Sequence, residues 1–418
     1  MNKVLLGLVL LLTLAAPVNA SETLSLQACL QRVREQSPEL LEVASSPRLA
    51  ASAVDSISSA YRPRVGISAG YTLQQAPQQV VIGGISAPTQ DQDFAHLNIV
   101  VDQLLYDFGR TAGGLGAARA AARAAQFIYA SVEQKLLLQT VASYYRVLSA
   151  QALLRTAQDE VVQTEAHLKR VNALYEQGVV TRNDVLQAEV RLAANHQQVL
   201  ALNGEEQNSW LELNYLTARP AAARGELEAE ALASPESASD LIPTRPDLLA
   251  QQERIQGAVE TVRKSASEFR PELYAHLAAD YVANNHVEEQ TIYSTTLGLR
   301  FLLYDGGARQ AKLNQAEEVL RQERQHLINL EQHAQLEEQT ARNEAHVAQQ
   351  QINVALAAIG QARENLRINQ ERYQEQVGTA TEVLDAQTLL TQARTALVKT
   401  QFAYQVAVAR VRYATGQL

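Results

Sequence analysis

Residues 301–309 read Phe-Leu-Leu-Tyr-Asp-Gly-Gly-Ala-Arg, and the hydrophobic period of the chain changes across them. Before this stretch apolar and polar residues alternate, which predicts a β-strand. After it, about seventy residues continue in a three-and-four apolar rhythm without a proline, which predicts a helix. Asp305, Gly306 and Gly307 form a turn signal between the two patterns. We therefore predict that a strand ends and a very long helix begins here.

The same stretch occurs earlier as Leu-Leu-Tyr-Asp-Phe-Gly-Arg over 104–110, so that Tyr106 precedes Tyr304 by 198 positions (304 − 106). Four further landmarks recur in the same order: 37–40 with 245–248, 61–63 with 269–271, 184–188 with 382–386, and 214–218 with 412–416. A duplicated order of landmarks predicts two structural repeats. We place them at 21–218 and 244–418, joined by a linker or equatorial segment over 219–243.

Each repeat is predicted to contain an opening helix, two strands and a long helical hairpin. The strands are expected at about 64–76, 94–106, 272–283 and 293–304, and the hairpins at about 110–217 and 307–416. Strands of about 9–12 residues with one apolar face can cross a bilayer when tilted, although an antiparallel sheet on a soluble core shows the same period. The helices favour the membrane interpretation, because about 65–70 residues at 1.5 Å each give nearly 100 Å, more than a globular domain needs.

The N-terminus has the pattern of a secretory signal peptide. Lys3 precedes an apolar run over 4–14, and Pro17 and the small-residue site ending at Ala20 follow it. We predict cleavage after Ala20; a retained anchor is the alternative, but the run is shorter than the roughly 18–20 apolar residues of a membrane helix. The lone Cys29 shares a helical face with apolar residues, which predicts core packing.

Composition and motifs argue against several classes of function. A net charge of −9 disfavours nucleic-acid binding, which needs a basic stripe. The sequence has no Walker-A loop, no His-Glu-x-x-His and no nucleophile elbow. His326, His333 and His346 are spaced too widely along one helix for a tight metal site. We therefore expect no enzymatic activity, no cofactor and no metal.

Four strands per chain cannot close a barrel, and lipid does not tolerate an open sheet edge. If the strands lie in a membrane, several chains must share one barrel. Twelve strands from three chains would enclose a lumen, whereas eight from two would be nearly filled by side chains. The polar strand face would then line that lumen; it carries His96, Asp102, His276, Asp280 and Arg300.

The duplicated order of helix, hairpin, Tyr-Asp-x-Gly hinge and long helix, with a Gly-x5-Asp-Val-Leu-x-Ala turn over 178–188, resembles the TolC-like outer-membrane efflux proteins. The resemblance implies a mostly α, α+β fold and a homotrimer. Its twelve-stranded β-barrel would lie in the outer membrane of a Gram-negative-type cell and continue into a periplasmic coiled-coil tunnel. It also implies a passive exit duct with porin activity for efflux or type I secretion, which docks onto a periplasmic adaptor (membrane fusion) protein and an inner-membrane pump. A soluble periplasmic coiled-coil tether or adaptor is the alternative.

The resemblance also suggests which residues act. The family pattern places acidic residues at a narrow periplasmic constriction, which here correspond to Asp184, Glu382 and Asp385; the alternative is that they are helix N-terminal acids favoured by the macrodipole. The second tip, counted from Gly378 to Glu382, reads two residues shorter than the first, counted from Gly178 to Asp184. Ala380 stands where relatives carry a basic gate residue, which puts a salt-bridged gate in question for this chain.

Two further sets of residues complete the candidate site. Exposed apolar groups at a hairpin end suit a partner interface, with ordinary hairpin packing as the alternative. The candidates for adaptor contact are Gly178, Val179, Val185, Val377, Gly378 and Val383. The hinge is expected at the membrane interface, where aromatic residues would form a girdle and glycines would let the backbone turn. Its residues are Tyr106, Asp107, Phe108, Gly109, Phe301, Tyr304, Asp305, Gly306 and Gly307.

Overall fold

The computed structural model describes residues 23–229, 231 and 245–418. The predicted signal peptide at 1–20 and most of the second half of the linker at 219–243 lie outside the described residues. The chain divides into two compact units. Among the described residues, we call them the sheet unit (38–136, 245–344 and 410–418) and the hairpin unit (23–37, 137–229, 231 and 345–409).

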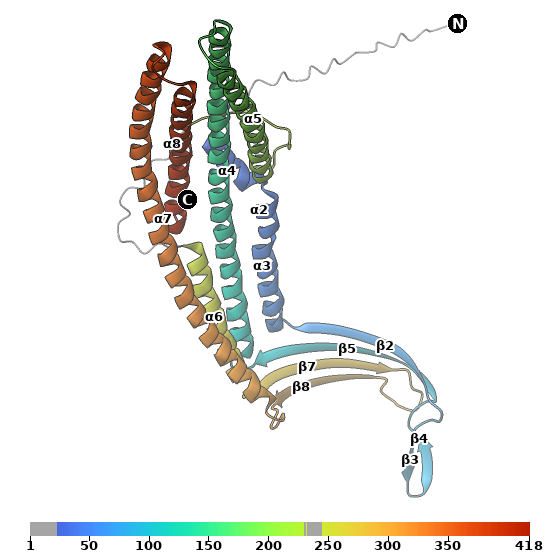
Figure 1. Ribbon diagram of the computed structural model, residues 1–418. Helices are drawn as coiled ribbons and strands as arrows, with labels where there is room; N and C mark the ends of the chain where they lie inside the picture. Colours follow the sequence, from blue (N-terminus) through green and yellow to red (C-terminus); the bar gives the residue numbers. More distant parts are fainter. Residues whose placement is uncertain (1–22, 230, 232–244) are drawn as a thin grey trace, which may run out of the picture. The chain divides into compact units, whose positions relative to one another are not determined.

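The sheet unit contains one antiparallel sheet of four strands in the order β2-β5-β7-β8, which lie side by side in Figure 1. The strands are β2 (Arg64–Leu73), β5 (Asp93–Tyr106), β7 (Glu272–Val282) and β8 (Thr291–Arg300). These bounds lie close to the predicted ones, except that β8 ends at Arg300 and residues 301–304 have no regular structure. The outer strands β2 and β8 each leave one edge without a partner strand in the described chain.

The strand register places the predicted polar residues on one face. Asp102 pairs with His276 and their side chains approach to 2.7 Å, while Glu272 pairs with Arg300 at 3.0 Å. Asp280 of β7 accepts a hydrogen bond from the side-chain amide of Asn98, its partner on β5. The other face carries exposed apolar side chains, among them Val65, Ile67, Tyr71, Leu73, Leu277, Tyr293, Leu297 and Leu299. The sheet therefore has one polar and one apolar face, as the alternation predicts.

Two glycines on the polar face lie under aromatic rings of the next strand. A Cβ on Gly70 would come within 2.5 Å of the His96 ring, and a Cβ on Gly298 within 2.4 Å of the Tyr274 ring. Such glycine–aromatic pairs across strands help to fix the register of a sheet.

At the end of the sheet remote from the hinges, residues 76–92 lie between β2 and β5, where no strand was predicted. This segment contains a separate hairpin, β3 (Gln79–Ile82) and β4 (Ile85–Pro88). Gly83 and Gly84 connect the strands with φ of 62° and 87°, values that suit the tight turn of a two-residue hairpin. Two glycines between two apolar runs were the signal for this hairpin.

The helices of the two repeats have equal lengths. The long helices α4 (Arg110–Glu176) and α7 (Ala308–Gln374) each have 67 residues. The return helices α5 (Arg182–Leu216) and α8 (Ala380–Ala414) each have 35. Every start and end differs by 198 positions (308 − 110, 374 − 176, 380 − 182, 414 − 216).

Shorter elements complete the fold. The opening helix of the first repeat is broken into α2 (Pro38–Val43), α3 (Ser45–Ser58) and a 3₁₀ turn (Ser59–Tyr61), whereas α6 (Pro246–Ser267) is continuous. α1 (Leu26–Gln36) buries Cys29 in the hairpin unit, as predicted, near the parallel pair β1 (Thr23–Leu24) and β6 (Glu226–Leu227). Within the described parts of the chain, no helix combines the length and the apolarity needed to cross a membrane.

Small side chains allow the long helices to pack closely. On α7, Ala334, Ala341, Ala348 and Ala355 are buried at steps of seven residues, which is a coiled-coil period. On α4, a Cβ added to Gly113 would lie 2.9 Å from the carbonyl oxygen of Glu260 on α6. The three-and-four apolar rhythm of the long helix α7 therefore forms a packed seam of alanines.

Candidate functional site

An aspartate caps the start of each long helix at the strand–helix hinge. Asp107 accepts hydrogen bonds from the backbone N–H of Gly109 (3.2 Å) and of Thr111 (2.7 Å). Asp305 accepts the matching hydrogen bonds from the backbone N–H of Gly307 (3.1 Å) and of Arg309 (2.9 Å). The first N–H groups of a helix have no intrahelical partner, and a negative charge there is favoured by the helix dipole. Both aspartates were among the predicted hinge residues, and the structure adds that they act as helix caps.

The backbone passes through left-handed conformations at both hinges. Phe108 and Gly109 have φ of 58° and 102°, and Gly306 and Gly307 have φ of 69° and 89°. Phe108 thus occupies the position that glycine holds in the second hinge, at a cost of about 1–2 kcal/mol for a non-glycine residue. Its ring packs edge-on against Tyr106, with 4.7 Å between ring centroids.

An arginine follows the second hinge and ties it to the preceding helix. The Arg309 side chain donates to Asp305 (Nε–Oδ2, 2.9 Å) and to the carbonyl of Glu268 (3.2 Å), and its guanidinium lies 5.3 Å over the Phe269 ring. The backbone N–H of Arg309, followed by its guanidinium and the N–H of Gly307, holds the pKa of Asp305 below its ordinary value. The ion pair between Arg309 and Asp305 therefore stabilises this hinge in addition to the backbone turn.

The first hinge is tied instead to a strand of the second repeat. Arg110 forms an ion pair with Glu272 of β7 (2.5 Å), and Glu272 also binds Arg300 of β8. Glu272 thus joins the first long helix to both strands of the second repeat. The other aromatic side chains of the hinges are exposed, Tyr304 to 81% and Phe301 to 46%.

The acids at the hairpin tips belong to capping boxes. Asp184 accepts hydrogen bonds from the backbone N–H (2.8 Å) and the hydroxyl (2.7 Å) of Thr181. Glu382 accepts from the N–H of Thr379 (2.9 Å), and the Thr379 hydroxyl accepts from the N–H of Glu382 (3.2 Å). Both acids therefore stabilise helix starts, which favours the alternative interpretation given above. Asp385 is exposed on α8 and forms no hydrogen bond or ion pair within the described chain.

The two tips have the same length, so the predicted shortening of the second tip is wrong. In the first tip, the left-handed Gly178 (φ 72°) follows α4 and Thr181 precedes α5. In the second tip, Gln376 (φ 58°) and Thr379 occupy the same positions 198 residues later (376 − 178, 379 − 181). The prediction paired Gly378 with Gly178, but the left-handed residue of the second tip is a glutamine. The glycine has moved two positions within a turn of unchanged length.

This correction changes the role of Ala380, which matches Arg182 of the first tip (380 − 182 = 198) and is buried, 2% exposed. The basic group of the second tip is Arg372, which lies 3.6 Å from Glu382 and donates to the carbonyl of Val377 (3.3 Å). This ion pair links residues of one tip.

The six residues predicted to contact an adaptor fall into a buried group and a solvent-accessible group. Val185 and Val383 are 0% and 2% exposed and pack inside the hairpins, so they have no surface to offer a partner in this arrangement. Val179 and Val377 are 43% and 67% exposed, Gly178 is exposed and Gly378 is half-buried. The spacing of Val185 and Val383 three residues before the buried alanines Ala188 and Ala386 could have indicated their core position.

A cleft of about 400 Å³ lies between the two tips. It is lined by Arg170, Leu174, Val179 and Val180 of the first hairpin and by Tyr373, Gln374, Gln376 and Gly378 of the second. Beside it the Thr381 hydroxyl donates to the Gln187 side chain (2.9 Å), so the tips also touch directly.

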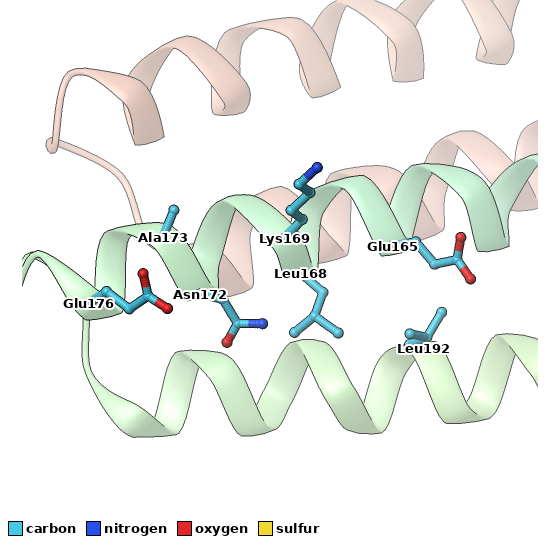
Figure 2. A pocket seen from close by; sticks show the side chains of 7 residues that line it. All are labelled: Glu165, Leu168, Lys169, Asn172, Ala173, Glu176 and Leu192. Carbon is cyan, nitrogen blue, oxygen red and sulfur yellow. The ribbon is translucent and has the colours of Figure 1, made fainter.

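A second hollow, of about 460 Å³, lies on the first hairpin alone (Figure 2). Leu168 of α4 and Leu192 of α5 point toward one another across it, whereas Lys169 points away from α5. Glu165, Asn172, Ala173 and Glu176 complete the lining. No group of three or more His, Cys, Asp or Glu side chains in the described ranges is placed to hold a metal ion.

The sheet with one polar face, the twin hinges and the twin helical hairpins can now be compared with known proteins. The pattern of the outer membrane efflux protein family matches residues 29–219 and 238–417. The chain belongs to this family. It is therefore an outer-membrane efflux channel protein with its long helices in the periplasm, and a soluble tether receives no support. Outer-membrane factors of this family are trimeric and work with adaptors and inner-membrane pumps.

Individual relatives agree with this assignment. The outer membrane protein TolC of Vibrio cholerae is 24% identical over 408 residues, which cover 93% of this chain and 89% of that protein. The outer-membrane channel OprN shares the fold with a TM-score of 0.85 at 17% identity, covering 94% of this chain and 90% of the other. The outer membrane protein VceC of Vibrio cholerae gives a TM-score of 0.83 at 19% identity, covering 94% and 96%.

Proposed function

We propose that three copies of this chain close one barrel and continue it as a tunnel, forming a passive exit duct. The observation that carries the proposal is the four-stranded sheet with unpaired edges on β2 and β8. An unpaired backbone N–H or C=O costs several kcal/mol in hydrocarbon, so a lipid-embedded sheet must close on itself or on copies. Pairing β2 of one chain with β8 of the next satisfies both edges.

The polar face favours three chains over two. An eight-stranded barrel has an interior that side chains fill, whereas twelve strands leave room for water. The charged groups of Asp102, Glu272, His276 and Arg300 lie on that face and need hydration beyond their mutual contacts. The exposed apolar face then meets lipid, and the six hinges of a trimer, with their exposed aromatic side chains, lie at the periplasmic membrane surface.

The exposed parts of the tips support a docking role. Val179 and Val377, with Gly178 and Gly378 beside them, are the surface through which the duct meets a periplasmic adaptor and, through it, an inner-membrane pump that supplies the energy. Asp385 is the carboxylate best suited to a constriction, because Asp184 and Glu382 are engaged in capping boxes. Three copies of Asp385 around one axis would attract cations and repel one another.

Planar-bilayer recording of the purified protein tests this function. We expect steady ion conductance from an oligomer that runs above the monomer on a gel and collapses to the monomer on heating. Recovery of the protein in the soluble periplasmic fraction, without a heat-modifiable oligomer and without conductance, would overturn the proposal.

A further inference from the structure

His167 of α4 lies buried beneath the tip cleft, where the two hairpins pack together. The side chain is 5% exposed, and its Nε2 has no hydrogen-bond partner in the described chain. Its ring centroid lies 6.0 Å from that of Tyr373 on α7, which lines the cleft. The Tyr373 hydroxyl is also buried and without a partner. Buried polar atoms are normally hydrogen-bonded, so two such atoms on facing hairpins call for a functional explanation.

The charged groups around His167 disfavour its protonated form. Burial, followed by the positive charge of Arg170 one turn further along α4, lowers the pKa of His167. On α5, Asp184 is held in its capping box, and on α8, Glu382 is paired with Arg372 of α7. No carboxylate is therefore in place to accept a hydrogen bond from Nε2.

We infer that His167 makes the packing of the two hairpin tips sensitive to acid. A neutral imidazole fits between α4 and α7 as a largely apolar ring. A protonated imidazole would place a second positive charge beside Arg170 and bury an N–H without an acceptor. Moving the tips apart hydrates the ring and relieves both costs.

The pH range follows from linkage. With the tips apart, His167 is hydrated and titrates near its ordinary value of about 6.5. With the tips packed, the ring binds a proton less readily. The packed arrangement therefore has its full stability above about pH 6.5 and loses it as the pH falls from there through the lower packed-state pKa. When the pH falls below both pKa values, the ratio of separated to packed tips in each chain rises tenfold for every pH unit by which the two pKa values differ.

In the proposed duct, this device would let acid loosen the periplasmic end of the tunnel. That consequence rests on the proposed function, whereas the response of the hairpins to acid is a property of the chain itself. A test based on the distance between the hairpins therefore stays informative even if the protein does not conduct.

The test uses spin labels at Leu186→Cys on α5 and Leu389→Cys on α8, two positions that are 44% and 50% exposed. Distances are measured by pulsed electron paramagnetic resonance at pH 7.5 and pH 5.0, with labelled chains diluted in unlabelled ones. The background Cys29 is 1% exposed, and burial raises the pKa of its thiol to about 12, so it stays unlabelled. We expect the fraction of long distances to rise at least threefold at pH 5.0.

Substitutions identify the titrating group. His167→Gln removes the titration and should abolish the response to pH, whereas His346→Gln, on the exposed side of α7 in the same unit, should leave it intact. His167→Lys should show long distances already at pH 7.5, and His167→Gln keeps the test decisive if the lysine variant does not fold. An unchanged distance distribution between pH 7.5 and 5.0 would overturn the inference. A response that persists in His167→Gln would also overturn it, because other groups would then be responsible.

Discussion

Replacing Asp107 by alanine should release the first turn of α4. The change removes the acceptor of two backbone hydrogen bonds, and loss of a helix-capping aspartate costs about 0.5–2 kcal/mol. The side chain is only 8% exposed, so the N–H of Thr111 would be left without solvent or partner, which adds about 1 kcal/mol. We expect a local loss of about 2 kcal/mol, equivalent to a factor of about 30 in the opening equilibrium.

Hydrogen exchange measures this opening directly. Amide exchange over residues 109–113 should become about 30-fold faster in Asp107→Ala, because exchange from a locally opened state follows the opening equilibrium. Asp107→Asn keeps one acceptor and loses the charge at the helix start, so a smaller acceleration, about threefold, is expected. Asp159→Ala, at an exposed position within the same helix, is the control and should leave these amides unchanged. Unaltered exchange in Asp107→Ala, or equal effects of Ala and Asn, would refute the capping argument.

Four further predictions follow from the same structure. At the second hinge, the pKa of Asp305 is lowered from 3.8, so amide protection there should persist at pH 4–7 and be lost only as the pH falls below 3.8 through the folded-state pKa. Arg245→Ala should destabilise the sheet unit by about 1.5–3 kcal/mol, because the buried Arg245 side chain loses its hydrogen bonds to the partly exposed carboxylates of Asp247 (2.8 Å) and Glu337 (2.6 Å). Asp385→Asn should weaken the block of single-channel current by multivalent cations. Iodoacetamide at pH 8 should leave Cys29 unmodified in the folded protein, because the pKa of its thiol is raised by burial to about 12.

Each of these predictions has a result that contradicts it. Protection at the second hinge that disappears between pH 5 and 4 would show that Asp305 is not held in its ionised form. Arg342→Ala serves as the control for Arg245→Ala, because it breaks a partly exposed ion pair with Glu338 one turn away on α7. If Arg245→Ala lowers the melting temperature no more than Arg342→Ala does, burial does not strengthen the Arg245 ion pair. Unchanged cation block in Asp385→Asn would remove this residue from the constriction, and rapid alkylation of Cys29 would show that the core of the hairpin unit opens readily.

The order of elements could be predicted because the chain carries its pattern twice. A change of hydrophobic period at Tyr106 and again at Tyr304 locates both hinges, and a constant offset of 198 carries the helix bounds from one repeat to the other. Alternation along the strands also predicts the polar face. It cannot show which side chains meet, since the contact between Asp102 and His276 depends on a register that only the packed sheet defines.

The tips were harder to predict, for a physical reason. Glycine is the usual residue in the left-handed turn after a helix, so Gly378 was paired with Gly178. The second tip places Gln376 there instead, and the surrounding hydrogen bonds of Val377 and Gly378 to the carbonyl of Arg372 (2.9 and 3.0 Å) hold the turn. These local backbone hydrogen bonds stabilise a turn in which the left-handed glutamine costs about 1–2 kcal/mol relative to glycine. Val383 packs in a core of its own hairpin, against which Leu174 and Val180 of the first hairpin also pack, and the sequence does not show this second contact.

Closure of the barrel by three chains is the central claim, and disulfide cross-linking between β2 and β8 tests it most directly. Ile67→Cys would be combined in turn with Thr295→Cys, Leu297→Cys and Leu299→Cys, all on the apolar face of the two edge strands. We predict that at least one combination gives cross-linked dimers and trimers under oxidation and nothing larger. The absence of cross-links in all three combinations, or a ladder that continues beyond three chains, would contradict the account.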